Sequence, residues 1–327
     1  QIPQLLLTCP ENVQSHYHEL CVADHYPACY PILASLPKLT IHSWLTALQT
    51  ERLEQKAQLI TQRLALCNRN WEDAFFITLA RNFGFGLNGD AFETWAGLLP
   101  FRAMDKHRND LFQIEAFFYG LAGLLEETFL KKEQEDEYSL RLCKEFRYLQ
   151  RKFEIGQGMD ATLWRFLRLR PENFPHIRLA QLAYLYQKGD KLFSRLLEAE
   201  TLADVRTLLD ARTSPYWENH YLFGRLSSQK EKAMGERSKD LIIINTVVPF
   251  LYTYGLHKAD ERMFERAGRF LEELKAESNH IIRSWSDAGL AVVSAADSQA
   301  LIQLQKEYCD KRKCLYCRFG YEYLKHT

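Results

Sequence analysis

The sequence predicts a mainly α-helical protein, an irregular multi-helix domain with a short extended segment at its N-terminus. Apolar residues recur three and four positions apart along much of the chain, which is the spacing of one buried helix face. Glycine and proline are few, 15 and 10 among 327 residues, so little of the chain suits long linkers. No fixed repeat period is present, which argues against a regular solenoid.

The first 36 residues are expected to be an extended segment and linker that follow a preceding domain. Residues 1–8 are rich in leucine and stand before Cys9 and Pro10, which is typical of a strand. We interpret them as the last strand of a sheet whose other strands are missing, with a docked or disordered terminus as the alternative. Residues 37–327 then form the helical domain, with a division into two subdomains near residues 215–238 as an option.

Apolar spacing and capping residues predict the earlier helices. A stripe at residues 53, 57, 60 and 64 marks a long helix that starts after Pro37. Asn70 suits the N-cap of the next helix, because acidic residues follow it in the first turn. The glycine-rich residues 84–89 end that helix in a turn. Gly120 and Gly123 interrupt a third stripe, which indicates close contact with another helix.

The later helices are predicted in the same way. Residues 138–153 form a charged amphipathic helix, and Pro175 is placed in the first turn of the next one. Residues 241–248 are ambiguous because isoleucine and valine also favour strands. We interpret them as a buried helix, with Pro249 either kinking it or starting the next helix. A long helix at residues 259–274 follows, and the last long one runs from about residue 297 to 308.

Composition excludes a strong global field and a membrane span. The formal net charge is zero, so attraction to nucleic acid must come from local patches. The longest apolar run, residues 241–254, is too short and too interrupted for a bilayer. No signal peptide is visible and the eight cysteines are mostly dispersed, so we expect a cytoplasmic protein without membrane contact.

The most specific local feature is a cysteine cluster, Cys309-x4-Cys314-x2-Cys317, at the end of the last long predicted helix. Two thiolates of a Cys-x2-Cys knuckle can bind one metal, and a third nearby can supply most of a tetrahedral site. Zinc or an iron–sulfur cluster suits these soft ligands. No fourth ligand is evident, although His280 and His326 are near in sequence. The alternative is three reduced cysteines packed against the last helical turn.

Cations and aromatic residues surround that cluster. Lys311, Arg312, Lys313 and Arg318 are candidates for contact with phosphates, and the aromatic residues between 308 and 323 are suited to stacking on bases. Together these features predict a small, metal-stapled contact with DNA or RNA. The alternative is a solvated helix face whose aromatic residues turn inward.

A second basic stretch runs from residue 141 to residue 178. Its candidates for nucleic-acid binding are Arg165, Arg168, Arg170 and Arg178, because arginine suits bidentate contact with phosphate. The alternative is internal pairing with the acidic residues 126–137 just before it.

A looser run of His16, His18, Cys21, His25 and Cys29 matches no defined metal-site spacing. The chain also lacks a nucleophile elbow, a His-Glu-x-x-His motif, a dinucleotide fingerprint and a phosphate loop. No catalytic residue is therefore predicted. Whether the protein is an enzyme stays open, because an active site assembled from distant residues leaves no motif.

Four runs, at residues 42–54, 79–89, 169–180 and 308–320, resemble an uncharacterised bacterial family of unknown function that is common in Bacteroidetes. The resemblance implies a longer protein with an N-terminal, restriction-endonuclease-like nuclease region, whose last strand would be residues 1–8. The acidic and lysine residues of such a nuclease are absent here, so no catalytic role transfers. The cysteine cluster loosely resembles the cluster loop of helix-hairpin-helix DNA glycosylases, with three cysteines instead of four and different spacing.

These observations favour a helical, nucleic-acid-contacting accessory domain of a nuclease-like protein. Its expected partners are DNA or RNA and the preceding N-terminal domain. The alternative is a helical protein-interaction or scaffold domain without nucleic acid or catalysis.

Overall fold

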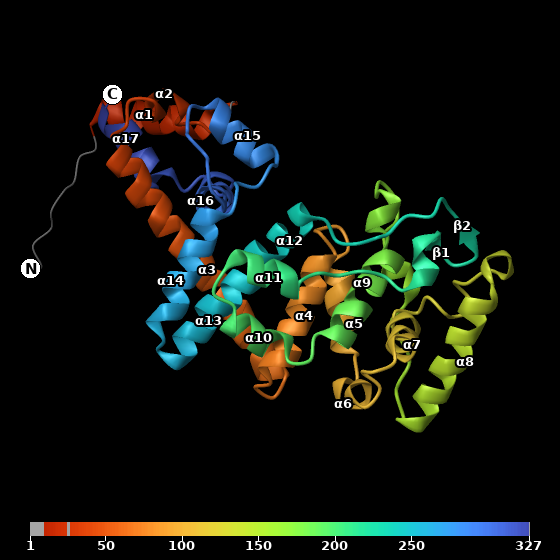
Figure 1. The fold of residues 1–327 in the computed structure, drawn as a ribbon. Coiled ribbons are helices and arrows are strands. Elements are labelled where there is room, and N and C mark those ends of the chain that lie inside the picture. The colour runs from red at the N-terminus through yellow and green to blue at the C-terminus, as the bar shows by residue number, and fades with distance from the viewer. Residues whose placement is uncertain (1–9, 25–26, 327) are drawn as a thin grey trace, which may run out of the picture. The chain divides into compact units, whose positions relative to one another are not determined.

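The computed structural model describes residues 10–24 and 27–326 and confirms a mainly α-helical protein (Figure 1). Residues 1–8, predicted to be a strand, lie outside the described residues. The chain forms two compact units, Gln1–Gln58 with Tyr252–Thr327 (unit 1) and Leu59–Leu251 (unit 2). The boundaries fall inside helices α3 (Lys38–Leu66) and α13 (Val248–Lys258), not near residues 215–238. Long-range packing defines them, which local composition does not reveal.

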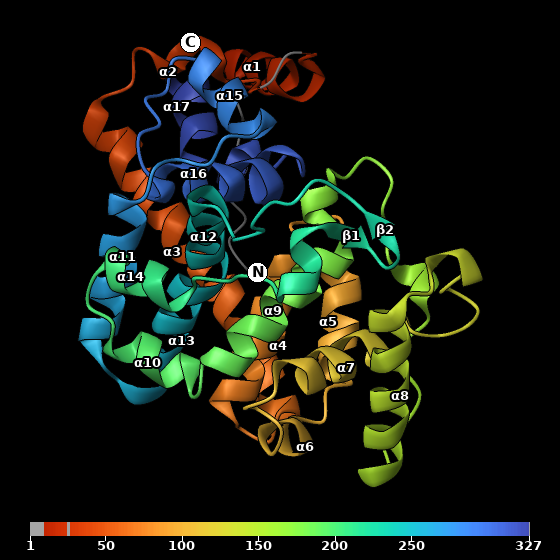
Figure 2. The same ribbon diagram turned by 45° about the vertical axis from the view of Figure 1, so that its right-hand side comes forward.

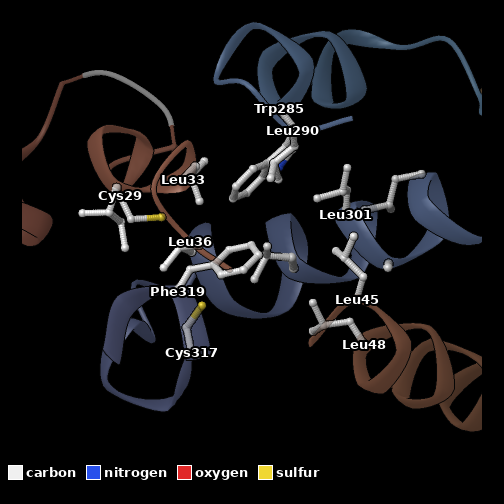
Figure 3. Packing of buried hydrophobic residues seen from close by; sticks show 14 of the residues in the cluster. Cys29, Leu33, Leu36, Leu45, Leu48, Trp285, Leu290, Leu301, Cys317 and Phe319 are labelled. Atoms are coloured by element: carbon white, nitrogen blue, oxygen red, sulfur yellow. The ribbon is translucent and has the colours of Figure 1, made fainter. Parts of the chain in front are cut away.

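Unit 1 is built from helices at both ends of the chain. Helix α17 packs against α1 and α2, and α16 packs against α14 and α15. Its core contains buried side chains from α3 and from both ends of the chain, including Leu33, Leu48, Trp285 and Phe319 (Figure 3). The remaining bounds are α1 (Glu11–Val22), α2 (Tyr30–Leu33), α14 (Glu261–Glu273), α15 (His280–Asp287), α16 (Ala295–Gln303) and α17 (Arg318–His326).

The first 36 residues differ from the expected extended segment, because residues 11–22 and 30–33 are helical. Leu20, Ile32 and Leu33 are buried in the core of unit 1. Their burial against helices from the end of the chain stabilises these short helices, whereas helices of this length are marginal alone.

Unit 2 is a bundle in which α7 contacts both α8 and α9, while α4 packs on α5 (Figure 2). A small antiparallel hairpin pairs His220 with Leu226. The bounds are α4 (Trp71–Phe83), α5 (Gly89–Gly97), α6 (Phe101–Asp105), α7 (Leu111–Leu121), α8 (Glu137–Lys152), α9 (Pro175–Lys188), α10 (Leu192–Glu198), α11 (Leu202–Leu208), β1 (His220–Leu222), β2 (Arg225–Leu226) and α12 (Glu236–Ile242).

The predicted caps are confirmed. The Asn70 side chain accepts hydrogen bonds from the N–H groups of Glu72 and Asp73, at 3.0 and 3.3 Å. Pro175 occupies the first turn of α9, where a missing N–H removes no helical hydrogen bond.

Among the described helices, none combines the length and the apolar character needed to cross a membrane.

The ambiguous residues 241–248 are helical, as predicted, and Pro249 explains a local irregularity. A π-helical turn, Ile243–Val247, joins α12 to α13. Pro249 has no N–H to donate to the carbonyl of Asn245, four residues earlier. The Asn82 side chain donates to that carbonyl instead, at 3.0 Å, and also to the Thr246 hydroxyl at 2.8 Å. The Asn82 side chain on α4 therefore replaces the missing backbone donor.

Gly120 and Gly123 serve different purposes. A Cβ at Gly120 would overlap the Phe146 ring on α8, which confirms the predicted close contact between helices. Gly123 lies beyond the end of α7, and its φ of +71° is one that glycine adopts readily. Its role is to turn the chain.

Replacing Gly120 with alanine tests this contact. Gly120→Ala should lower the free energy of unfolding by about 1–3 kcal/mol, because the added methyl group forces Phe146 to move. Urea denaturation followed by circular dichroism measures the effect. Gly97→Ala is the control in the same unit, because a Cβ there meets nothing within 4 Å. Equal stabilities of the two variants would contradict the contact.

A buried carboxyl group lies inside unit 2. Glu115 on α7 is fully buried and accepts hydrogen bonds from the Tyr138 hydroxyl and, at 2.9 Å, from the Ser214 hydroxyl. Burial raises its pKa to about 7, although these hydrogen bonds oppose the rise. The folded state therefore keeps a proton that the unfolded chain releases at lower pH.

This difference predicts a pH-dependent loss of stability. The unfolded chain loses this proton near the ordinary pKa of 4.5, whereas the folded protein keeps it up to about pH 7. The free energy of unfolding therefore falls by on the order of 3 kcal/mol between these two pH values and stays constant above pH 7. Glu115→Gln cannot ionise and should lack this loss. Urea denaturation of both proteins at several pH values between 4 and 8 (roughly the titration window) checks it. Parallel pH profiles would contradict the prediction.

Candidate metal centre and nucleic-acid interface

The three tail cysteines lie in one compact loop of unit 1. Helix α16 continues as a π-helical turn, Leu304–Cys309. A 3₁₀ turn, Cys314–Tyr316, follows after four intervening residues. The N–H of Lys313 donates to the Tyr308 carbonyl at 2.8 Å, which folds the loop back on itself. A Cβ at Gly320 would overlap the Cys314 carbonyl. Glycine is therefore needed where α17 passes this loop.

The loop encloses a small cavity with apolar walls. Cys309, Cys314 and Cys317 line it together with Cys29, which precedes α2. Leu20, Ala23, Ala28 and Trp285 are among its other lining residues. The cavity holds about 30 Å³, which is room for an ion or a water molecule. The structure thus brings the three predicted cysteines together and adds a fourth.

The cysteine environment favours neutral thiols. Burial raises the pKa of the Cys309 thiol, and the neighbouring Cys317 and Cys29 raise it further. Burial also raises the pKa of Cys314 and of Cys29. In the part of the chain that the structure describes, no three His, Cys, Asp or Glu side chains are positioned to hold a metal ion as they stand. The zinc or iron–sulfur centre stays a prediction.

Two histidines were suggested as a fourth ligand, and only the side chain of His280 lies among the described residues. His280 begins α15 and is not among the residues lining the cavity. The side chain of His326 lies outside the described side chains. Cys29 belongs to the loose Cys/His run at the N-terminus, where its separation from the tail in sequence concealed its place beside the cluster.

The four tail cations differ in their surroundings. Lys311 pairs with Glu307 at 2.5 Å, and Arg318 pairs with Glu322 at 3.0 Å. Arg312 donates to the Cys21 carbonyl and lines the cysteine cavity. Lys313 is exposed, and within the described residues its side chain makes no hydrogen bond or ion pair.

A shallow groove of about 490 Å³ shares Cys317 with the cavity. Tyr316 and Tyr321 line it and expose 79% and 51% of their surface. The Arg318 guanidinium stands over the Tyr321 ring, 5.6 Å from its centre. We call this surface the Tyr316 groove; its lining residues are Ser43, Trp44, Leu315, Tyr316, Cys317, Arg318 and Tyr321. Phe319, in contrast, is fully buried, so only part of the aromatic set turns inward.

Three arginines of the second basic stretch are exposed in unit 2. Within the described chain, the side chains of Arg165, Arg168 and Arg170 make no hydrogen bond or ion pair. Asn88, which is buried, holds the backbone of Arg165 by accepting from its N–H at 2.8 Å and donating to its carbonyl at 2.9 Å. The segment is therefore anchored by its backbone and leaves its guanidinium groups in solvent.

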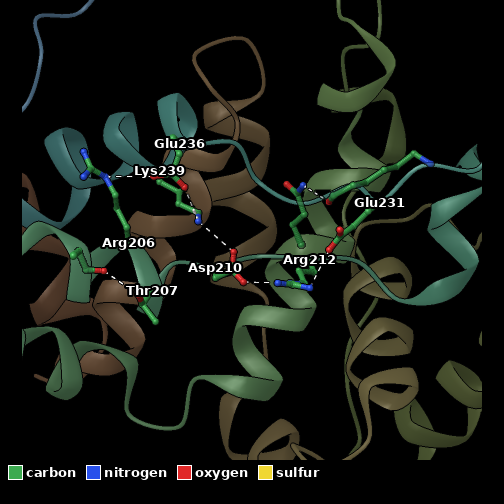
Figure 4. Close-up of polar contacts among 10 residues, drawn as sticks. Arg206, Thr207, Asp210, Arg212, Glu231, Glu236 and Lys239 are labelled. Atoms are coloured by element: carbon green, nitrogen blue, oxygen red, sulfur yellow. Dashed lines mark hydrogen bonds and ion pairs between the residues drawn. The ribbon is translucent and has the colours of Figure 1, made fainter.

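Pairing with the acidic residues 126–137 is limited among the described side chains. Arg147 lies 3.5 Å from Glu127, and both are largely exposed. Elsewhere in unit 2, cations are engaged with acids. Lys239 pairs with Asp210 and Glu236, while Arg212 pairs with Asp210 and Glu231 (Figure 4). These paired cations offer less charge to a phosphate ligand than the three exposed arginines do.

Arg178 occupies a different position from the other predicted arginines. It is 6% exposed, and burial lowers its pKa to about 10. Its guanidinium donates to Gln181 at 2.7 Å and to Asn173 at 2.6 Å, and it stacks over the Phe85 ring. This arginine fastens the start of α9 and offers no open face to phosphate.

Comparison with known proteins identifies the family of this chain. The sequence profile described as "Protein of unknown function (DUF2851)" matches residues 1–280, so the chain belongs to that family. No curated protein and no solved structure matches it.

The position of Arg178 predicts a structural effect of its removal. Arg178→Ala should lower the free energy of unfolding by about 1–3 kcal/mol, because the buried Gln181 and the half-buried Asn173 lose their donor. Arg170→Ala, an exposed arginine in the same unit, should change it by less than about 0.5 kcal/mol. Chemical denaturation of both variants provides the test, and a neutral Arg178→Ala would refute this role.

Proposed function

We propose that this DUF2851 protein contacts nucleic acid, and that the Tyr316 groove is the contact surface. The observation that carries the proposal is the exposure of Tyr316 and Tyr321 beside Arg318. Large aromatic side chains rarely stay this exposed without a ligand when they gather in one hollow. Exposed rings offer stacking faces to bases, and Lys313, which is exposed and unpaired among the described residues, offers charge to phosphates.

Single-stranded nucleic acid fits this surface better than a duplex. A base stacks on an aromatic side chain only when it is unpaired and can leave its own stack. The formal net charge of zero also argues against non-specific attraction to a duplex over the whole surface. Arg165, Arg168 and Arg170 are proposed as a second set of phosphate contacts, since they are exposed and unpaired among the described residues.

A protein-interaction role is the second candidate, and one observation favours it. Leu163 and Leu167 expose 49% and 81% of their surface in the segment that carries the exposed arginines. Exposed leucines beside cations also suit a protein surface. The nuclease-like preceding region implied by the resemblance stays a prediction; it would be the part that supplies catalysis.

Stacking predicts a large loss of affinity when a groove tyrosine is removed. Fluorescence anisotropy with a labelled single-stranded oligonucleotide at low ionic strength should show binding by the wild type. Tyr316→Ala and Tyr321→Ala should each weaken it by about 1–3 kcal/mol, roughly 5- to 150-fold. The affinity should fall as salt rises, and Lys313→Glu should lessen that dependence.

Tyr148→Ala is a matched control. Tyr148 is 54% exposed, and the Lys152 ammonium stands 5.5 Å from its ring centre, much as Arg318 does at Tyr321. It lies on α8, away from the groove residues in sequence and in unit. Its removal should leave affinity unchanged. No binding at low ionic strength, or an equal loss in Tyr148→Ala, would overturn the proposal.

A further inference from the structure

The cavity beside the tail loop brings together cysteines from the two ends of the chain. Cys29 lies just before α2, and the other three lie between α16 and α17, yet all four line the same space. Cys29 and Cys317 are both buried in the hydrophobic core cluster of unit 1 (Figure 3).

We infer that Cys29 is the fourth ligand of a four-thiolate metal centre completed by Cys309, Cys314 and Cys317. Four cysteines are the complete ligand set of a structural zinc site and of common iron–sulfur clusters. The cavity of about 30 Å³ has room for a single ion, so the ligand is one zinc ion. The inference does not depend on the proposed contact with nucleic acid.

A buried donor near Cys317 gives the site a second feature. The indole N–H of Trp44 is buried and makes no hydrogen bond within the described residues. Trp44 and Cys317 line the same groove. A neutral thiol is a weak acceptor, whereas a metal-bound thiolate accepts such donors well.

The rearrangement needed for binding is local. As they stand, the thiols of the described chain are not positioned to hold an ion, so they must draw together around it. Three of them belong to one nine-residue loop, Cys309 to Cys317, which can adjust without moving the helices. Each thiol that binds releases its proton to solvent, so binding gains affinity as pH rises.

Cys21 is the nearest competitor for the fourth position. It interacts electrostatically with Cys314. However, it does not line the cavity, and its backbone carbonyl accepts from the Arg312 side chain. Cys29 lines the cavity and is buried. Cys21 and Cys29 can therefore be told apart by substitution.

Metal analysis of the full chain tests the inference. Protein purified without oxygen and then offered zinc should hold about one zinc ion per chain. Elemental analysis measures the zinc, and an iron–sulfur cluster detected by visible absorption after incubation with ferrous iron and sulfide would overturn the zinc assignment. Cys29→Ser should lose the metal, as should Cys314→Ser, whereas Cys21→Ser and Cys143→Ser should retain it.

Thiol labelling of the wild type keeps the test valid where a variant does not fold. In the metal-loaded protein, the four thiols should resist alkylation and become reactive together after a chelator removes the metal. Cys67 and Cys143, which are half-buried in unit 2, should react equally in both states. A wild type that binds no metal, metal that persists in a folded Cys29→Ser, or Cys29 reactivity that ignores the chelator would each overturn the inference.

Discussion

The packing of α17 against α1 and α2 is the contact on which the rest of unit 1 depends. It buries Phe319 and Leu33 in one core and joins residues that are far apart in sequence. The Tyr323 hydroxyl donates to Glu19 at 3.0 Å at the edge of this contact. Because the tail loop immediately precedes α17, the same packing places the loop cysteines beside Cys29 and directs Tyr316 and Tyr321 outward. The cavity and the groove thus share Cys317, the last residue of this loop.

Local signals predicted much of the fold. Asn70, Pro175 and the apolar stripes depend on residues a few positions apart, so the sequence alone identified the helices and their caps. The helices at residues 11–22 and 30–33 escaped prediction because distant partners stabilise them. The boundaries of the two units were missed for the same reason, since unit 1 combines both ends of the chain.

The candidate site shows the same limit. The spacing of the three tail cysteines was visible in the sequence, but their closeness to Cys29 depends on tertiary packing. Arg165, Arg168 and Arg170 are exposed. The Arg178 side chain, eight residues after Arg170, instead donates hydrogen bonds to Asn173 and Gln181. Residue type suggested the same role for all four arginines. Their exposure separates them, and exposure is a property of the fold.

The discontinuity of unit 1 has a consequence for biosynthesis. Residues 59–251 emerge from the ribosome as an uninterrupted stretch, so unit 2 can acquire its structure during translation. Unit 1 must wait until residues 252–327 have been made, and closing so long a loop is slow. Until then, the apolar surfaces of α1, α2 and the start of α3 lack their partners. The segment that carries α1 and α2 is therefore expected to need shielding by chaperones during synthesis, and binding of the proposed metal must follow synthesis of residues 252–327.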